Sequence, residues 1–312
     1  MIANKKIAVL ICTYNGEKFL RQQLESIVAQ TYSNWEIFAS DDGSTDDTLA
    51  ILEEYQRTLG QERFHIVKGP GKGFAWNFLS LLEVSGDGFD YYAFSDQDDE
   101  WLTTKLEHSL NKLNALKADN EGRPALHCGR TMLINEFNEC IGYSPLFEKA
   151  PSFKNALIQS IAGGNTMMFN APARKLICLT PHDYKIISHD WWIYIVISGC
   201  GGDVIYDESP TIKYRQHTSN IIGSNLGWRA RFRRINGLFD GHFQKWIQCN
   251  LDALNVMRLP LTDENRLILE TFIRARSATF FERIMKFLEI KLYRQTGFGT
   301  LAFFIAVAFK KI

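Results

Sequence analysis

The stretch that decides the fold is Tyr91-Tyr92-Ala93-Phe94-Ser95-Asp96-Gln97-Asp98-Asp99-Glu100-Trp101, in which an apolar run ends abruptly in acidic residues. The apolar half is typical of a buried strand whose carboxyl end delivers carboxylates to a cleft. Two carboxylates set two positions apart, as Asp96 and Asp98 are, can bind one hard cation that in turn holds phosphate oxygens. The alternative is a helix that begins at Trp101, because Asp99 and Glu100 would be favoured near its positive end. Spacing alone leaves both interpretations open.

The residues before this stretch alternate between strand and helix patterns. Apolar runs at residues 7–12, 35–40 and 64–67 predict strands, and apolar residues at helical spacing follow each of them. This order is typical of a parallel sheet with right-handed crossovers. Ligands of such sheets bind beyond the carboxyl ends of the strands. The polar turns that begin at Thr13, Asp41 and Asp96 should therefore face one crevice, which favours a site over a helix start.

The residues after Trp101 follow a less regular pattern. A helix is expected at 101–116, a long strand at 125–137 that turns into 140–143, and a loop from 161 that leads into a short strand. Pro172 suits the first turn of a helix. Ser188 and Asp190 both suit the start of an apolar helix at 191–197. Two further strands are expected at 204–206 and 211–214.

Composition narrows the class of protein. The chain has 312 residues with 35 Lys and Arg against 35 Asp and Glu, so no general attraction to nucleic acid is expected and any anion site must be local. Its six cysteines form no Cys-x-x-Cys pair, which predicts reduced thiols of a cytoplasmic protein. The apolar run at 7–12 is too short for a signal peptide, and no run reaches the roughly 18 apolar residues of a membrane-spanning helix.

Five motifs, in their order along the chain, resemble those of family 2 glycosyltransferases with a GT-A fold. They are Thr13-Tyr14-Asn15-Gly16, Asp41-Asp42-Gly43-Ser44-Thr45-Asp46, Asp96-Gln97-Asp98, His189-Asp190-Trp191-Trp192 and Tyr214-Arg215-Gln216-His217. The resemblance covers about residues 5–222. It implies an α/β fold with a mixed, mainly parallel sheet flanked by helices and followed by a helical C-terminal extension. Within the family, the motifs are most similar to those of bacterial rhamnosyltransferases that build surface polysaccharide.

The resemblance implies a donor site and a metal site. The residues expected to bind the donor are Thr13, Tyr14, Asn15, Asp42, Asp96 and Arg215, and those expected to bind Mg²⁺ or Mn²⁺ are Asp98 and His217. Tyr14 would stack on the base, and Asp42 would accept from the N–H of a pyrimidine. A divalent cation stabilises the negative charge of a departing diphosphate. Ordinary roles stay open, because Asp42-Gly43 is also a strong turn signal and a lone histidine is more often structural.

A second set of residues is expected on the acceptor side. An acceptor hydroxyl loses its proton as it attacks, so a carboxylate must lie within hydrogen-bond reach. The resemblance assigns this role to Asp190 and implies inversion at the anomeric carbon, although Asp190 could also cap the next helix. Gly164 and Asn165 would let sugars approach the backbone closely. Trp191 would form a wall of the acceptor pocket, with core packing as the alternative.

The C-terminal region, 226–312, is expected to be helical and distinct from a glycosyltransferase domain at 1–225. It begins with a basic aromatic cluster made of Trp228, Arg229, Arg231, Phe232, Arg233 and Arg234. Its apolar segment at 298–309 precedes Lys310 and Lys311 and is apolar nearly all round, so we expect it to be buried in something. These features suit peripheral contact with anionic lipid at the inner face of the cell membrane. An oligomer interface or a solvated basic face is the alternative.

The sequence as a whole predicts an inverting, metal-dependent glycosyltransferase of the cytoplasm. The subfamily resemblance implies dTDP-rhamnose as the nucleoside diphosphate sugar and a glycan or lipid-linked acceptor. Two other hypotheses stay open. A nucleotidyltransferase would leave a nucleotide on its product, and a nucleotide-sugar-binding scaffold of a polysaccharide assembly complex would bind without turnover.

Overall fold

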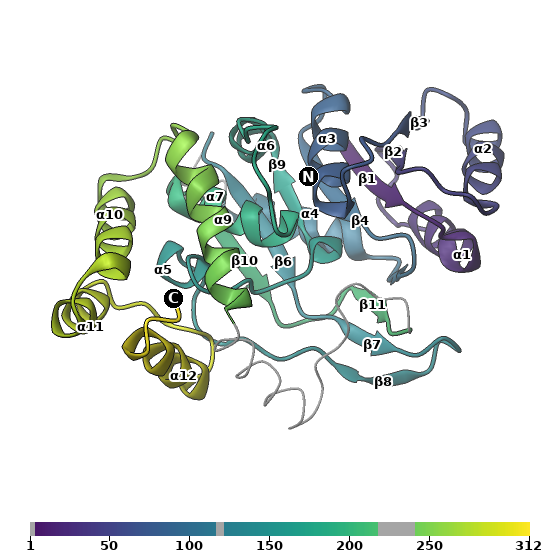
Figure 1. Ribbon diagram of the computed structural model, residues 1–312. Coiled ribbons are helices and arrows are strands. Elements are labelled where there is room, and N and C mark those ends of the chain that lie inside the picture. The colour runs from purple at the N-terminus through teal and green to yellow at the C-terminus, as the bar shows by residue number, and fades with distance from the viewer. Residues whose placement is uncertain (1–3, 117–121, 218–240) are drawn as a thin grey trace.

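The computed structural model describes residues 4–116, 122–217 and 241–312 (Figure 1). Its strands are β1 (Ile7–Thr13), β2 (Trp35–Asp41), β3 (Phe64–Lys68), β4 (Tyr91–Ser95), β5 (Glu100–Trp101), β6 (Ala125–Gly129), β7 (Met132–Ile134), β8 (Cys140–Tyr143), β9 (Met168–Asn170), β10 (Asp203–Asp207) and β11 (Ile212–Arg215). Its helices are α1 (Glu17–Val28), α2 (Thr48–Leu59), α3 (Phe74–Val84), α4 (Lys105–Ala115), α5 (Phe153–Ala156), the 3₁₀ turn η2 (Gly164–Thr166), α6 (Ala171–Ile177), α7 (His189–Gly199), α9 (His242–Val256), α10 (Asp263–Ser277), α11 (Phe280–Glu289) and α12 (Gly297–Ala308).

A seven-stranded sheet in the order β10-β6-β9-β4-β1-β2-β3 forms the centre of the molecule. β1 pairs in parallel with β2 and with β4, β2 with β3, and β6 with β10. Among the described strands of this sheet, β9 alone is antiparallel to its neighbours, β4 and β6. The predicted mixed, mainly parallel α/β fold is therefore confirmed. The carboxyl ends of the parallel strands share one edge, which is where ligands bind in such sheets.

Alternate residues of β1 pack into two different cores, which explains its continuous apolar run. Ile7, Val9 and Ile11 join the core that also contains residues of α1, α2 and α4. Ala8 and Leu10 join the core shared with α3, α7 and the C-terminal helices. Central parallel strands are buried on both faces, so they lack the alternation of polar and apolar residues seen in half-exposed strands.

A second sheet, in the order β5-β11-β7-β8, corrects the prediction of one long strand at 125–137. That segment is two strands, β6 and β7, which belong to different sheets. The chain turns after Gly129, where the Arg130 amide donates to the Asp207 carbonyl at 2.9 Å. A Cβ at Gly129 would lie 2.9 Å from that same oxygen, so the close approach requires glycine.

The helix predicted to begin at Trp101 begins instead at Lys105, so the prediction of its start was wrong. Trp101 lies in β5, where it pairs with Ile212 and donates its amide to the Ser26 hydroxyl at 3.0 Å. Asp99 and Glu100 therefore do not start the helix. These tertiary contacts outweigh the local preference of acidic residues for a helix N-terminus.

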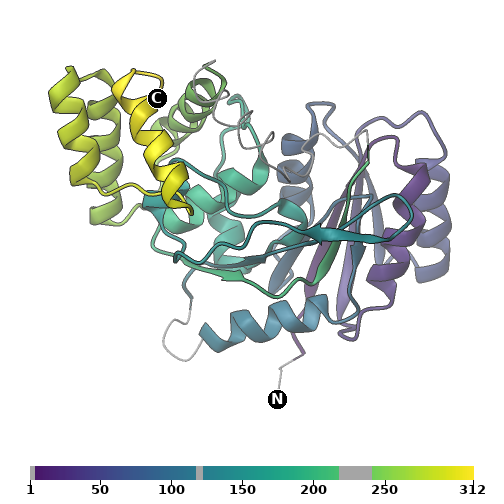
Figure 2. The same ribbon diagram turned by 90° about the horizontal axis from the view of Figure 1, so that it is seen from below.

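The C-terminal helices extend the core on the α7 side of the sheet. Trp191 in α7 stacks on Phe243 in α9, with ring centroids 6.2 Å apart, and Phe287 in α11 contacts both Phe272 and Phe303. Figures 1 and 2 show α10, α11 and α12 at one end of the molecule, far from α1 and α2. Within the described ranges, no helix combines the length and hydropathy needed to cross a bilayer.

Two predictions about the C-terminal region concern residues that the structure does not describe. The domain boundary at 225/226 and the basic aromatic cluster at 228–234 both fall within 218–240, outside the described residues. They remain predictions. The segment at 298–309, expected to be buried in something, buries one face of α12 in the protein and exposes Phe298, Leu301 and Ile305.

The Phe272–Phe287–Phe303 contact predicts a large stability effect at one phenylalanine of α11 and almost none at another. Phe287 is fully buried, so Phe287→Ala should lower the free energy of unfolding by about 3–5 kcal/mol. Phe281 is 81% exposed, so Phe281→Ala should change it by less than about 0.5 kcal/mol. Urea denaturation followed by circular dichroism measures both values. Equal effects of the two substitutions would contradict this packing.

Candidate active site

The acidic loop that follows β4, residues 96–99, is tied to the β1–α1 turn by Gln97. The Gln97 side-chain carbonyl accepts from the Tyr14 amide at 2.9 Å, and its side-chain amide donates to the Tyr14 carbonyl at 3.0 Å. A Cβ at Gly16 would lie 2.2 Å from the Gln97 side chain, so the glycine makes room for this clamp. Sequence reasoning missed Gln97 because its partner lies 83 positions away.

Asp99 holds the same loop in place through two hydrogen bonds. Its buried carboxylate accepts from the Asn165 side-chain amide at 2.5 Å and from the Arg215 backbone amide at 3.2 Å. Burial, followed by the charges of Asp98 and Asp96, raises the pKa of Asp99 well above its usual range. Asp99 therefore joins η2 and β11 to the acidic loop, a role that the expected helix start did not anticipate.

The Arg215 guanidinium holds the acidic loop from the side of β11. It donates to the Asp98 carbonyl at 2.9 Å, to the Gln22 side chain at 2.8 Å and to Asn138, and it lies 4.5 Å from the centre of the Phe19 ring. Arg215 has no exposed surface. Its side chain is therefore committed to protein acceptors, whereas the sequence predicted a direct contact with the donor. This placement favours a positioning role.

Asp98 and His217, the two residues expected to bind a metal, lie side by side. The His217 Nε2 atom is 2.7 Å from a carboxylate oxygen of Asp98, and their side chains are 12% and 20% exposed. The His217 ring packs beside Phe19, with centroids 5.3 Å apart. The segments that follow β4 and β11 thus place one oxygen and one nitrogen atom that can bind a metal side by side, and both side chains are partly exposed. Sequence spacing could not show this contact, which spans 119 positions.

Asp96 is a further acidic group in this loop and lies within electrostatic range of both Asp98 and Asp190. Burial, and then the charges of Asp98 and Asp190, raise the pKa of Asp96 to about 8. Burial also raises the pKa of Asp190, against hydrogen bonds from Ser188 and from the Trp191 amide at 2.6 Å. Asp190 lies in the first turn of α7. Its charge acts on Asp96, so it is within electrostatic range of the acidic loop. Like charges this close favour either a bound proton or a cation.

The two turns expected to bind the nucleotide pack against each other. Asp41 is buried and accepts from the Thr13 hydroxyl at 3.0 Å and from the Ser44 amide at 2.8 Å. The Asn15 side-chain carbonyl accepts from the Thr45 amide at 2.9 Å. Tyr14 remains 58% exposed. Thr13 and Asn15 therefore shape the turns, while the Tyr14 ring is open to solvent.

Asp42, expected to read the base, binds the loop between β3 and α3. Its carboxylate accepts from the backbone amides of Gly71 at 2.6 Å and Gly73 at 3.3 Å. Both glycines have positive φ values, 67° and 82°, which other residues adopt rarely. Asp42 therefore anchors the loop that contains Gly71 and Gly73.

The residues expected on the acceptor side are more enclosed than predicted. The space that a Cβ of Gly164 would occupy holds the His189 ring, whose Nε2 atom would be 2.0 Å away. Asn165 is 3% exposed and bound to Asp99. Trp191 is 6% exposed and donates its indole N–H to the Ala156 carbonyl at 2.7 Å. All three take part in packing and hydrogen bonding within the fold.

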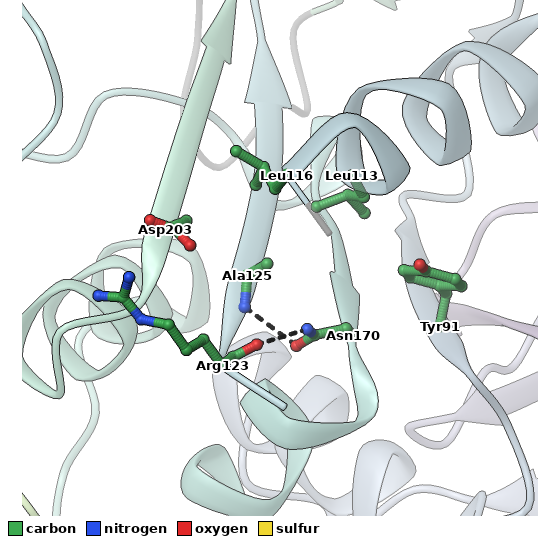
Figure 3. A pocket seen from close by; sticks show the side chains of 7 residues that line it. All are labelled: Tyr91, Leu113, Leu116, Arg123, Ala125, Asn170 and Asp203. Atoms are coloured by element: carbon green, nitrogen blue, oxygen red, sulfur yellow. Dashed lines mark hydrogen bonds between the residues drawn. The ribbon is translucent and has the colours of Figure 1, made fainter. Parts of the chain in front are cut away.

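A small pocket lies at the opposite edge of the sheet, as Figure 3 shows. Tyr91, Ala125 and Asp203 start β4, β6 and β10, and all three line it. Asn170, at the end of antiparallel β9, closes the pocket through hydrogen bonds with Ala125 and Arg123 (Figure 3). Because the amino ends of the parallel strands line this pocket, it lies away from the acidic loop and from the crevice.

A separate cluster of residues of the types that bind metals lies where α4, β6 and β10 meet. The ligand atoms of His108, His127 and Asp207 lie within 4.8 Å of one another, and the His108 Nε2 atom is 2.7 Å from the Asp207 carboxylate. The Lys112 ammonium already lies 2.9 Å from the same carboxylate oxygen. Although burial opposes it, the His127 ring 3.5 Å away and hydrogen bonds from Ser209 and Lys112 hold the pKa of Asp207 below its usual range. The lysine favours an internal ion-pair network over a bound cation.

Comparison with known proteins identifies the family. Residues 8–176, more than half of the chain, match the family model described as Glycosyl transferase family 2. The chain belongs to this family and is a glycosyltransferase, as its motifs predicted. A similar curated protein is the dTDP-rhamnosyl transferase RfbG of Shigella flexneri, 30% identical over 253 residues that cover 78% of this chain and 84% of the relative.

Solved structures support the fold. The S. aureus TarS fragment 1–349 matches with a TM-score of 0.54 at 15% identity, covering 91% of this chain and 80% of the fragment. The same fragment in complex with UDP-GlcNAc matches with a TM-score of 0.52 at 16% identity, covering 92% of this chain and 90% of the fragment. Both likenesses confirm the GT-A architecture.

His189, next to Asp190, should make the fold sensitive to acid. Its ring stacks on Phe78 with centroids 4.1 Å apart, and burial lowers its pKa to about 3. In the unfolded chain histidine has a pKa of about 6.5, so below that pH the unfolded state binds a proton that the folded state does not. Stability therefore falls as the pH drops. Between pH 7 and 5, His189 should cost about 2 kcal/mol.

Urea denaturation at pH 7 and pH 5 measures this contribution. The loss of stability on acidification should be smaller by about 2 kcal/mol in His189→Phe than in the unsubstituted protein. Phe281→Ala is the control, since Phe281 is 81% exposed and has no ionisable group, so its replacement should keep the original pH dependence. The same pH dependence in His189→Phe and the unsubstituted protein would show that His189 is not held neutral.

Proposed function

We propose that this glycosyltransferase works in the cytoplasm by an inverting, divalent-metal-dependent mechanism and transfers rhamnose from dTDP-rhamnose to a glycan or lipid-linked acceptor. The observation that carries the proposal is the contact of Asp98 with His217 at the carboxyl edge of the sheet, with Asp190 within electrostatic range of the neighbouring Asp96. The choice of donor is supported by the name of the RfbG relative.

The chemistry of the donor set fits Mg²⁺ or Mn²⁺. Asp98 offers a hard oxygen ligand and His217 a nitrogen ligand, and Mn²⁺ accepts both kinds. Burial, and then the charges of Asp98 and Asp190, raise the pKa of Asp96, and a cation would relieve the repulsion between these charges. When bound, the cation would offset the negative charge that builds on the departing diphosphate.

The donor is held by residues of three turns. The exposed Tyr14 ring would stack on the thymine base, and Asp96 would contact the ribose side. Asp42 would accept from the base N–H while keeping its bonds to Gly71 and Gly73, because a carboxylate offers about four lone-pair positions. Thr13 and Asn15 would keep the turns in place. Arg215 would act on the donor through the Asp98 backbone that it holds.

Asp190 would be the base of the reaction. Its raised pKa brings a carboxylate nearer to the pH at which it must accept a proton. The acceptor oxygen would give its proton to Asp190 and form a bond to the anomeric carbon, while the bond from that carbon to the diphosphate oxygen breaks on the opposite face. Gly164, Asn165 and Trp191 would support the acceptor side by fixing the start of α7 and the loop beside it.

A donor screen with the purified protein and divalent metal tests the function as a whole. dTDP-rhamnose with an acceptor glycan should release dTDP faster than other nucleoside diphosphate sugars do. A product that carries a nucleotide would indicate a nucleotidyltransferase instead. Binding without turnover, across varied donors and acceptors, would indicate a scaffold.

Two substitutions test the assigned roles in transfer. Asp190→Asn should lower kcat by on the order of 10²–10⁴-fold, because the amide cannot accept the acceptor proton. Asp98→Ala should also abolish transfer at the metal concentrations that support the unsubstituted protein. Raising the metal concentration should not restore it. Circular dichroism should show both variants folded, and Asp87→Asn at an exposed turn serves as control. Near-normal turnover of Asp190→Asn would overturn the base assignment.

A further inference from the structure

Two C-terminal helices, α11 and α12, carry large apolar side chains on their outer faces. In α11 these side chains recur at spacings of four and three residues, which places them on one face of the helix. They are Phe281, Met285 and Leu288, which are 81%, 65% and 52% exposed. In α12 the same kind of stripe is formed by Phe298, Leu301 and Ile305, which are 65%, 58% and 41% exposed. Exposed apolar surface of this extent marks an interaction site.

The fold does not need these outer faces. The opposite faces of the two helices carry the packing, with the Phe287 and Phe303 rings 5.7 Å apart and both fully buried. The Arg283 side chain donates to the Ala308 carbonyl and so links α11 to the end of α12. Each helix is therefore already fixed by its inner face, and the outer stripes are available for contact with another body.

The charge around the stripes has a definite sign. Residues 280–312 contain six Lys and Arg against two Glu, whereas the whole chain carries 35 of each sign. Three of the lysines are exposed and follow the helices directly, Lys291 after α11 and Lys310 and Lys311 after α12. Lysines at helix ends can extend their ammonium groups towards phosphate while the stem lies along apolar surface.

We infer that α11 and α12 form a docking surface for an anionic lipid bilayer. The inference rests on the proposed transfer to a lipid-linked acceptor, which brings the enzyme to a membrane surface. Apolar stripes flanked by exposed lysines combine the two attractions by which interfacial helices bind, burial of apolar side chains and attraction to acidic headgroups. A second copy of this chain would place the like charges of Lys291, Lys310 and Lys311 together, which disfavours it as the occupant.

The test is flotation of the full-length protein with vesicles. One set contains phosphatidylcholine alone, and the other contains phosphatidylcholine mixed with phosphatidylglycerol. The protein should float with the acidic vesicles and much less with the neutral ones. Phe281→Ser with Phe298→Ser should lower the bound fraction about tenfold or more, and Lys310→Gln with Lys311→Gln should lower it about tenfold.

A matched control uses exposed apolar residues of the neighbouring helix. Leu267 and Ile273 in α10 are 60% and 41% exposed, and their double substitution to serine should leave flotation unchanged. Sugar transfer to a water-soluble acceptor should be equal in all of these variants, because none of them touches the crevice. That second readout separates the docking surface from the transfer reaction, since either can fail without the other.

Three results would overturn the inference. The first is flotation that is equal for the Phe281 and Phe298 double variant and the unsubstituted protein. The second is flotation with no preference for acidic vesicles. The third is a dimer, detected by light scattering, that dissociates in the double variant while neither form binds vesicles. This last result would assign the surface to a second copy of the chain.

Discussion

The buried carboxylate of Asp99 is the constraint on which the crevice depends. It accepts from Asn165 in η2 and from the Arg215 amide in β11, so it joins two distant segments to the end of β4. Burial makes the charged form of this group costly and raises its pKa, and the two hydrogen bonds offset part of that cost. Because Arg215 also donates to the Asp98 carbonyl, the loop has little freedom to move relative to β11. His217, two residues further on, is thereby placed against Asp98.

Two glycines allow the surrounding parts to approach the acidic loop. Gly16 leaves space for the Gln97 clamp, and Gly164 leaves space for the His189 ring beside Asp190. A side chain at either position would collide with a residue next to a proposed metal ligand or base. The two glycines therefore serve the protein's own packing, and this differs from the expectation that Gly164 makes room for a sugar. The residues proposed for the donor side and those proposed for the acceptor side are in this way joined by packing around the acidic loop.

The sequence predicted the parts of the fold that depend on local pattern. Apolar runs followed by helical spacing identified β1 to β4 and their helices. It failed where distant residues decide the structure. Trp101 is a strand residue because Ser26 and Ile212 bind it, and Asp99 is an anchor because of Asn165 and Arg215, up to 116 positions away. The roles proposed for Asp98 and Asp190 came from a family resemblance, whereas the contact of Asp98 with His217 came from the structure.

The proposed mechanism requires a cation held by Asp98 and His217 at the donor diphosphate. A crystal structure of the protein soaked with Mn²⁺ and dTDP, recorded at a wavelength that gives anomalous scattering from manganese, tests it most directly. The account predicts an anomalous peak within bonding distance of Asp98 and of the diphosphate, with Tyr14 against the base. A peak only at His108, His127 and Asp207, or a diphosphate bound without metal near Asp98, would contradict it.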